Sequence, residues 1–86
     1  MSPEDKELLR HAVLDCLATR HPAALPIAGI LRRIKTELDF PCSEADVESA
    51  LDLLISLGHV HAAFDPLGRS RWYAATGQGL LYTERH

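Results

Sequence analysis

Two groups of basic side chains carry the clearest chemistry in this sequence. Arg69 and Arg71 come directly after a turn sequence at residues 65–68. The second group consists of Arg32, Arg33 and Lys35. Guanidinium and ammonium groups bind phosphate through charge-assisted hydrogen bonds, so both groups are candidate phosphate-binding residues. The alternative is that they are ordinary solvated charges on a hairpin edge and on a helix face.

A third group of charged side chains has the opposite sign. Residues 43–57 contain four acidic side chains and no basic one, a formal charge of −4: Glu44, Asp46, Glu48 and Asp52. An acidic surface repels the nucleic-acid backbone and attracts a basic partner. The positive end of a helix dipole accounts for acids near a helix start, which explains Glu44 and Asp46. For Glu48 and Asp52 two interpretations remain: they belong to a solvated helix face, or they form a docking surface.

Metal binding and catalysis find little support. His59 and His61 alternate along one predicted strand, so both imidazoles could reach one ion. The other candidate ligands have no tight metal-site spacing: His11, His21, Cys16 and Cys42. We therefore expect surface histidines and no metal. The sequence has no nucleophile elbow, phosphate-binding glycine loop or His-Glu-x-x-His segment, and we expect no enzyme activity, no cofactor and no small-molecule substrate.

Length and composition favour one small domain. The 86 residues, 47% of them hydrophobic, are enough for a single core, and we expect residues 1–86 to form one domain. The formal charge of −3 argues against a surface that attracts nucleic acid everywhere. The two cysteines form no close-spaced pair, and we find no signal peptide or membrane span. We expect a cytoplasmic protein without a membrane partner.

Three helices are predicted in the first two thirds of the chain. The first begins at Ser2-Pro3, carries apolar residues three and four apart, and ends before Pro22. Its expected apolar stripe is Leu8, Leu9, Ala12, Val13, Cys16 and Leu17. The second begins at Pro26 and extends to Leu38. The third begins at Ser43, whose cap is completed by Asp46, and Gly58 stops it in a left-handed conformation.

The third helix has two distinct faces. Its predicted buried stripe is Val47, Ala50, Leu51, Leu54 and Leu57. At about 100° per residue, the opposite face carries Ala45, Glu48, Ser49, Asp52 and Ser56. This exposed face is the candidate contact surface of the helix.

A hairpin follows, because the apolar period changes from 3.6 to 2 at His59. Residues 59–64 and 69–75 form its strands around the turn at 65–68. Trp72 and Tyr73 point to opposite faces, so one joins the core and the other is exposed, and the pattern leaves open which. Thr76 is expected to cap a final helical turn.

The order of these elements resembles the winged helix-turn-helix family of bacterial transcription regulators. The segment 47–60, Val-x-x-Ala-Leu-x-x-Leu-x-x-Leu-Gly-x-Val, is similar to a recognition helix and its exit into the wing. The segment 72–79, Trp-Tyr-Ala-Ala-Thr-Gly-Gln-Gly, resembles the aromatic-x-x-Thr-x-x-Gly end of a wing. The resemblance implies an α+β fold: a three-helix bundle, a short first strand at residues 23–25, a C-terminal hairpin wing and a short terminal helical turn.

The resemblance also implies a function. In DNA-binding members the third helix lies in the major groove and the wing contacts the backbone or minor groove. By position, the exposed face of the third helix would meet the bases, and the two basic groups would bind phosphate. We predict a small transcription-regulatory module that binds duplex DNA mainly through phosphate. The alternative is a protein–protein interaction module, with a protein partner or a second copy contacting the acidic third helix and the wing.

Overall fold

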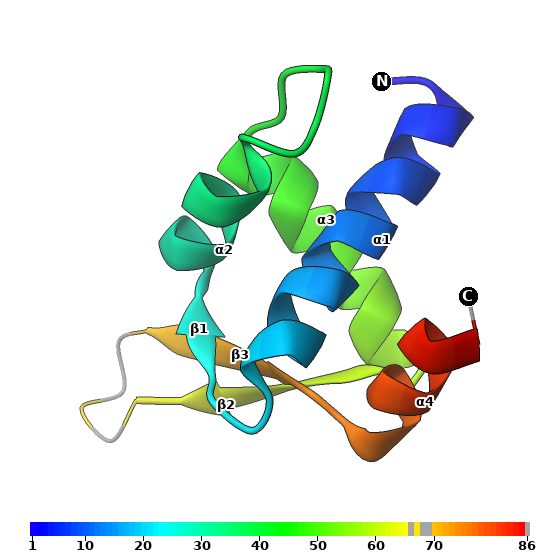
Figure 1. Ribbon diagram of the computed structural model, residues 1–86. Helices are drawn as coiled ribbons and strands as arrows, with labels where there is room; N and C mark the ends of the chain where they lie inside the picture. The colour runs from blue at the N-terminus through cyan, green and yellow to red at the C-terminus, as the bar shows by residue number, and fades with distance from the viewer. Residues whose placement is uncertain (66, 68–69, 86) are drawn as a thin grey trace.

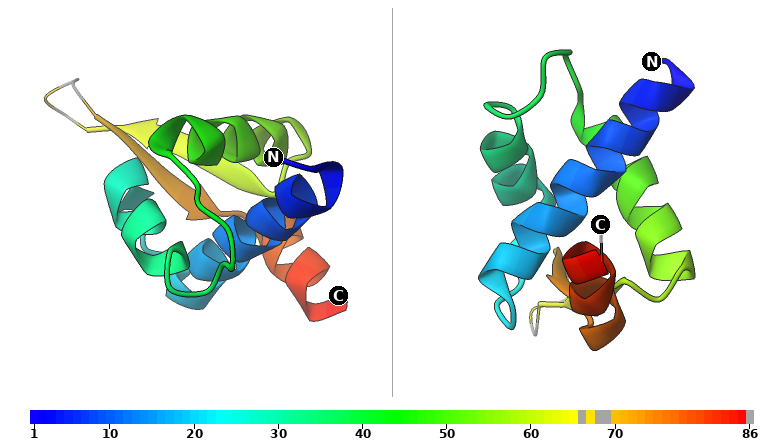
Figure 2. Two further views of the ribbon diagram at one scale, coloured as in Figure 1. Left: turned by 90° about the horizontal axis from the view of Figure 1, so that it is seen from above. Right: turned by 45° about the vertical axis from the view of Figure 1, so that its right-hand side comes forward.

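The computed structural model describes residues 1–65, 67 and 70–85. Its elements are, in chain order, α1 (Pro3–Arg20), β1 (Leu25–Pro26), α2 (Ile27–Ile34), α3 (Glu44–Ser56), β2 (Val60–Phe64), β3 (Arg71–Ala75) and α4 (Gly77–Arg85). Helices α1, α2 and α3 pack together on one side of a small sheet, and α4 lies beside α1 (Figure 1). The hairpin of β2 and β3 extends beyond the helices (Figure 2).

Helix α1 begins as predicted, with the Ser2 hydroxyl accepting a hydrogen bond from the backbone N–H of Asp5 at 3.1 Å. Four of the six residues predicted in its stripe are buried, and Cys16 is half-buried. Leu8 is 56% exposed, whereas Leu14 is buried. The reason is α4, because Leu14 lies next to Gly79 of that helix. Because α4 packs against α1 at this point, the buried face of α1 includes Leu14 and leaves Leu8 exposed.

Helix α2 is shorter than predicted and ends at Ile34. The chain turns after it, with the N–H of Glu37 bonded to the carbonyl of Ile34 at 2.9 Å. The Thr36 hydroxyl donates to the carbonyl of Arg33 at 3.1 Å. Side-chain bonds of this kind give the backbone an alternative to helix continuation, and the apolar Leu38 packs on the core from the turn that follows.

Helix α3 begins and ends as predicted. Ser43 and Asp46 form a reciprocal capping box, and Gly58 has φ +80°. Four of the five residues predicted in its stripe are buried: Val47, Ala50, Leu51 and Leu54. Leu57 is instead exposed. The helix ends one residue before it, at Ser56, and the Leu57 side chain lines a surface hollow together with Tyr82.

The three strands form an antiparallel sheet in the order β1-β3-β2. The first strand begins two residues later than the predicted 23–25 and ends one residue later, with Leu25 opposite Tyr73 and Pro26 opposite Trp72. The structure shows which of the two neighbouring aromatic residues joins the core: Tyr73 is 4% exposed, whereas Trp72 is 38% exposed. Residues Val60 and Ala75 pair at the base of the hairpin and are also buried.

The terminal helical segment is longer than one turn. The Thr76 hydroxyl accepts from the N–H of Gly79 at 3.1 Å, which is the predicted cap, and donates to the carbonyl of Gly58 at 2.6 Å. Helix α4 then continues to Arg85, because the Tyr82 ring packs on His59 and His11 with centroid distances of 4.6 and 6.2 Å. Among the described residues, no helix combines the length and apolarity needed to cross a bilayer.

Candidate nucleic-acid interface

The exposed face of α3 is the centre of the candidate surface. All five residues predicted on it are exposed: Ala45, Glu48, Ser49, Asp52 and Ser56. Within the described part of the chain, the one carboxylate contact to a basic side chain within 4.0 Å joins Glu7 to the imidazole of His11 at 3.9 Å. The carboxylates of Glu48 and Asp52 are therefore solvated, while the Asp46 carboxylate accepts the N–H of Ser43 at 2.9 Å in the helix cap.

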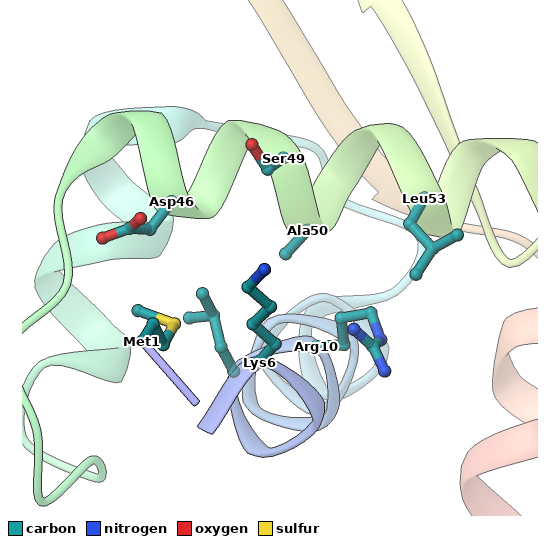
Figure 3. Close-up of a pocket in the computed structure, with 8 residues that line it drawn as sticks. Met1, Lys6, Arg10, Asp46, Ser49, Ala50 and Leu53 are labelled. Carbon is teal, nitrogen blue, oxygen red and sulfur yellow. The ribbon is translucent and has the colours of Figure 1, made fainter. Parts of the chain in front are cut away.

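Two cations that the sequence analysis did not select lie along one side of α3. Lys6 and Arg10 of α1 line a hollow of about 310 Å³ together with Ser49 and Leu53 of α3. Figure 3 shows the Lys6 side chain extending toward α3. Their spacing of four residues, which places two side chains on one helix face, is the signal that could have identified them. They give the acidic face of α3 a basic border.

The three basic residues of the second predicted helix do not lie on a common face. Arg32 and Lys35 are exposed, and Lys35 is close enough to the Cys42 thiol to lower its pKa, against the larger opposing effect of burial. Arg33 is half-buried, and its Nη1 donates to the carbonyl of Gly29 at 3.2 Å. Burial also isolates the Arg33 Nε, which has no hydrogen-bond partner among the described residues. Arg32 and Lys35 are thus the more accessible cations of the group.

The wing contributes an arginine held on an aromatic ring. Arg71 is exposed and lies opposite Phe64 in the strand register. Its guanidinium carbon lies 5.4 Å from the centroid of the Phe64 ring, a cation–π arrangement. Stacking leaves the guanidinium N–H groups available for phosphate. The second predicted wing cation, Arg69, lies outside the described residues.

The two thiols, Cys16 and Cys42, are partly buried. Burial raises the pKa of the Cys16 thiol, and burial together with the nearby Asp46 raises that of Cys42. A raised pKa reduces the thiolate fraction that nucleophilic chemistry requires. Over residues 1–65, 67 and 70–85, no group of three or more His, Cys, Asp and Glu side chains is arranged to hold a metal ion.

Three solved structures share this arrangement of helices and strands. A PadR family transcription regulator from Clostridium difficile superposes with a TM-score of 0.73 at 16% identity, over 90% of this chain and 80% of that one. ZitR from Lactococcus lactis, in apo form, gives 0.74 at 20% identity, over 96% of this chain and 57% of that one. A transcriptional regulator from Clostridium thermocellum gives 0.77 at 20% identity, over 99% and 82%.

Sequence comparison adds no relative. No protein-family model matches the chain, and no curated protein matches it. The structural likeness therefore stands on the arrangement of the backbone. The elements follow the order helix, strand, two helices, hairpin and terminal helix. This order and the structural similarities show that the chain has a winged-helix fold.

Proposed function

We propose that the chain is a single winged-helix domain that binds duplex DNA and regulates transcription. One observation carries the proposal: the exposed face of α3 is bordered by Lys6 and Arg10 on α1, and a stacked Arg71 extends from the wing. The similar structures include proteins named as transcription regulators, which agrees with it. The five side chains on the exposed face of α3 would meet the groove, and the cations at its border would bind phosphate.

Phosphate contacts supply most of the affinity in this arrangement. The α3 face has Glu48 and Asp52, which accept hydrogen bonds from cytosine but repel the backbone. Lysine and arginine contacts release counterions from DNA, so binding falls steeply with salt. The proposed phosphate-binding set is Lys6, Arg10, Arg32, Arg33, Lys35, Arg69 and Arg71. Arg10 and Arg33 are half-buried, and the other described members are exposed.

Fluorescence anisotropy with labelled duplex DNA tests the proposal, over a salt series from about 50 to 200 mM. We expect binding that weakens steeply with salt and is lost in the Arg69→Ala/Arg71→Ala variant. The matched control compares Arg71→Ala with Arg85→Ala, because Arg85 is also exposed but lies at the end of α4. Arg71→Ala should reduce the salt slope by about one phosphate contact, and Arg85→Ala should leave it unchanged. Absence of binding at the lowest salt contradicts the proposal.

One observation favours a second candidate, a protein–protein interaction module. Glu48 and Asp52 are exposed and, among the described residues, form no ion pair, so a basic partner could contact them. The variant Glu48→Lys/Asp52→Lys separates the two functions. DNA binding by α3 predicts that charge reversal strengthens the DNA complex, because repulsion is removed. A basic protein partner predicts loss of that association with DNA binding unharmed or improved.

A further inference from the structure

Strand β2 lies at one edge of the sheet, and no strand among the described residues pairs with its outer side. The N–H of Asp65 donates to the carbonyl of Ser70, and the N–H of Thr76 donates to the carbonyl of His59, both at 2.9 Å. Antiparallel pairs alternate between hydrogen-bonded and non-hydrogen-bonded positions. Counting inward from these two bonds, His61 and Ala63 direct their backbone groups to β3. Ala62 and Phe64 therefore direct their N–H and C=O groups to the free edge.

Burial limits the accessible part of this edge. Val60 is 2% exposed, so the fold closes the edge there, whereas Ala62, Ala63 and Phe64 are all exposed. Natural edge strands are protected by lysine, proline or bulges. Val60–Phe64 contains no charged residue and no proline, and its pairing with β3 is continuous, without a bulge. The segment Ala62–Phe64 is thus an unprotected edge.

We propose that this edge pairs with β2 of a second copy of the chain, antiparallel and centred on Ala63. In this register Ala62 lies opposite Phe64 of the second copy and Phe64 opposite Ala62, which pairs all the outward backbone groups of the segment. A twofold axis makes the contact self-complementary. Ala63 meets its own copy at a non-hydrogen-bonded position, where strands bring Cα atoms to about 4.5 Å.

The side chains around this register agree with a second copy as the occupant. Ala63 is small, and Trp72 lies opposite it in the register of β3, so the paired alanines would lie between two indole rings. The Phe64 ring, 66% exposed, gains a neighbour in Ala62 of the second copy. The Asp65 side chain lies opposite the imidazole of His61 of the second copy, so no acidic residue meets another in this register. The patch is small, so the association is weak and concentration-dependent.

Disulfide trapping tests the register directly. Ala63→Cys places two thiols across the axis within the Cα range of a disulfide, whereas His61→Cys puts a thiol on the same strand face about 13 Å from its own copy. We expect about tenfold more covalent dimer from Ala63→Cys than from His61→Cys under the same mild oxidation. The unmodified chain, with Cys16 and Cys42, supplies the background. Equal yields from the two variants, or no dimer above background from Ala63→Cys, would overturn the proposal.

Sedimentation velocity over a micromolar-to-millimolar series tests the edge without a cross-link. The unmodified chain should shift from monomer toward dimer. Ala62→Pro removes an outward N–H but no bond to β3, and Phe64→Lys adds a charge to the edge, so both should stay monomeric while circular dichroism shows a folded domain. A monomeric unmodified chain throughout the series, or folded variants that dimerise like it, would reject the second copy. The contact shares the wing with the proposed DNA surface, because the Phe64 ring carries the Arg71 guanidinium. Ala62→Pro leaves both of these side chains in place, so its sedimentation result separates a failure of the dimer from a failure of DNA binding.

Discussion

The two halves of the hairpin have the same strands and opposite environments. At its base, Val60, Tyr73 and Ala75 are buried beneath the helices, and Thr76 ties β3 to the end of α3. In the distal half, Phe64 and Trp72 are exposed although they are as apolar as the residues of the base. The difference arises from what covers the sheet and not from the strand sequence. The base fixes the fold, and the distal half is available to other molecules.

The neighbouring aromatic residues give the largest expected contrast. Tyr73→Ala should lower the free energy of unfolding by about 3–5 kcal/mol, because truncating a buried ring leaves a cavity against Leu25 and the core. Trp72→Ala removes a larger but partly exposed side chain, and we expect a loss of about 1 kcal/mol. Urea denaturation followed by circular dichroism measures both. Equal losses would mean that the two faces of β3 are covered alike at this point.

The glycines of α4 provide a sharper test of the base. A Cβ at Gly79 would collide with the carbonyl oxygen of His59, so Gly79→Ala should destabilise the domain by about 3 kcal/mol. Gly77→Ala is the matched control, because a Cβ there meets no atom within 4 Å. It should be neutral or stabilise the helix by up to about 1 kcal/mol. Thermal denaturation of the two variants side by side decides whether α4 is closely packed on the hairpin base.

The sequence predicted the two ends of α3 better than it predicted the end of α2 or the residues that α4 covers. Capping at Ser43 and the left-handed Gly58 follow from local chemistry, and both are confirmed. The predicted end of α2 was wrong, because the chain turns after Ile34 although the apolar pattern continues to Leu38. The exposure of Leu57 and the burial of Leu14 depend on where α4 packs, which no local pattern contains.

The candidate surface was predicted one helix at a time, and this is why part of it was missed. The α3 face follows from a single period, and all five residues predicted on it are exposed. Lys6 and Arg10 belong to the surface only because α1 lies beside α3. The choice between Trp72 and Tyr73 likewise needed the register with β1, which alternation within one strand cannot supply.

Thr76 offers a smaller test of the connection between the base and α3. Thr76→Val keeps the shape of the side chain but removes the hydroxyl that bonds Gly58 and Gly79, and we expect a loss of about 1–2 kcal/mol. Thr83→Val removes one hydroxyl that bonds only the carbonyl of Leu80 within the same helix, so its effect should be below about 0.5 kcal/mol. Urea midpoints measure both. A larger loss of stability in Thr83→Val would mean that α4 is held mainly by a bond within the helix and not by its N-terminal cap.

The smallest expected effect comes from a thiol on the covered side of the molecule. Burial raises the pKa of Cys16, which packs against the core, so the folded state favours the neutral thiol. This stabilisation is complete below the pKa of an unfolded cysteine, about 8.5, and is lost as the pH rises through the higher pKa of the folded state. Between pH 7 and pH 10 the urea midpoint of the unmodified chain should therefore fall more than that of Cys16→Ser.

The same burial predicts that iodoacetamide modifies Cys16 more slowly than a cysteine introduced at Ala63 in the exposed half of the hairpin. Equal rates would show that the covered and exposed sides differ less than their burial indicates.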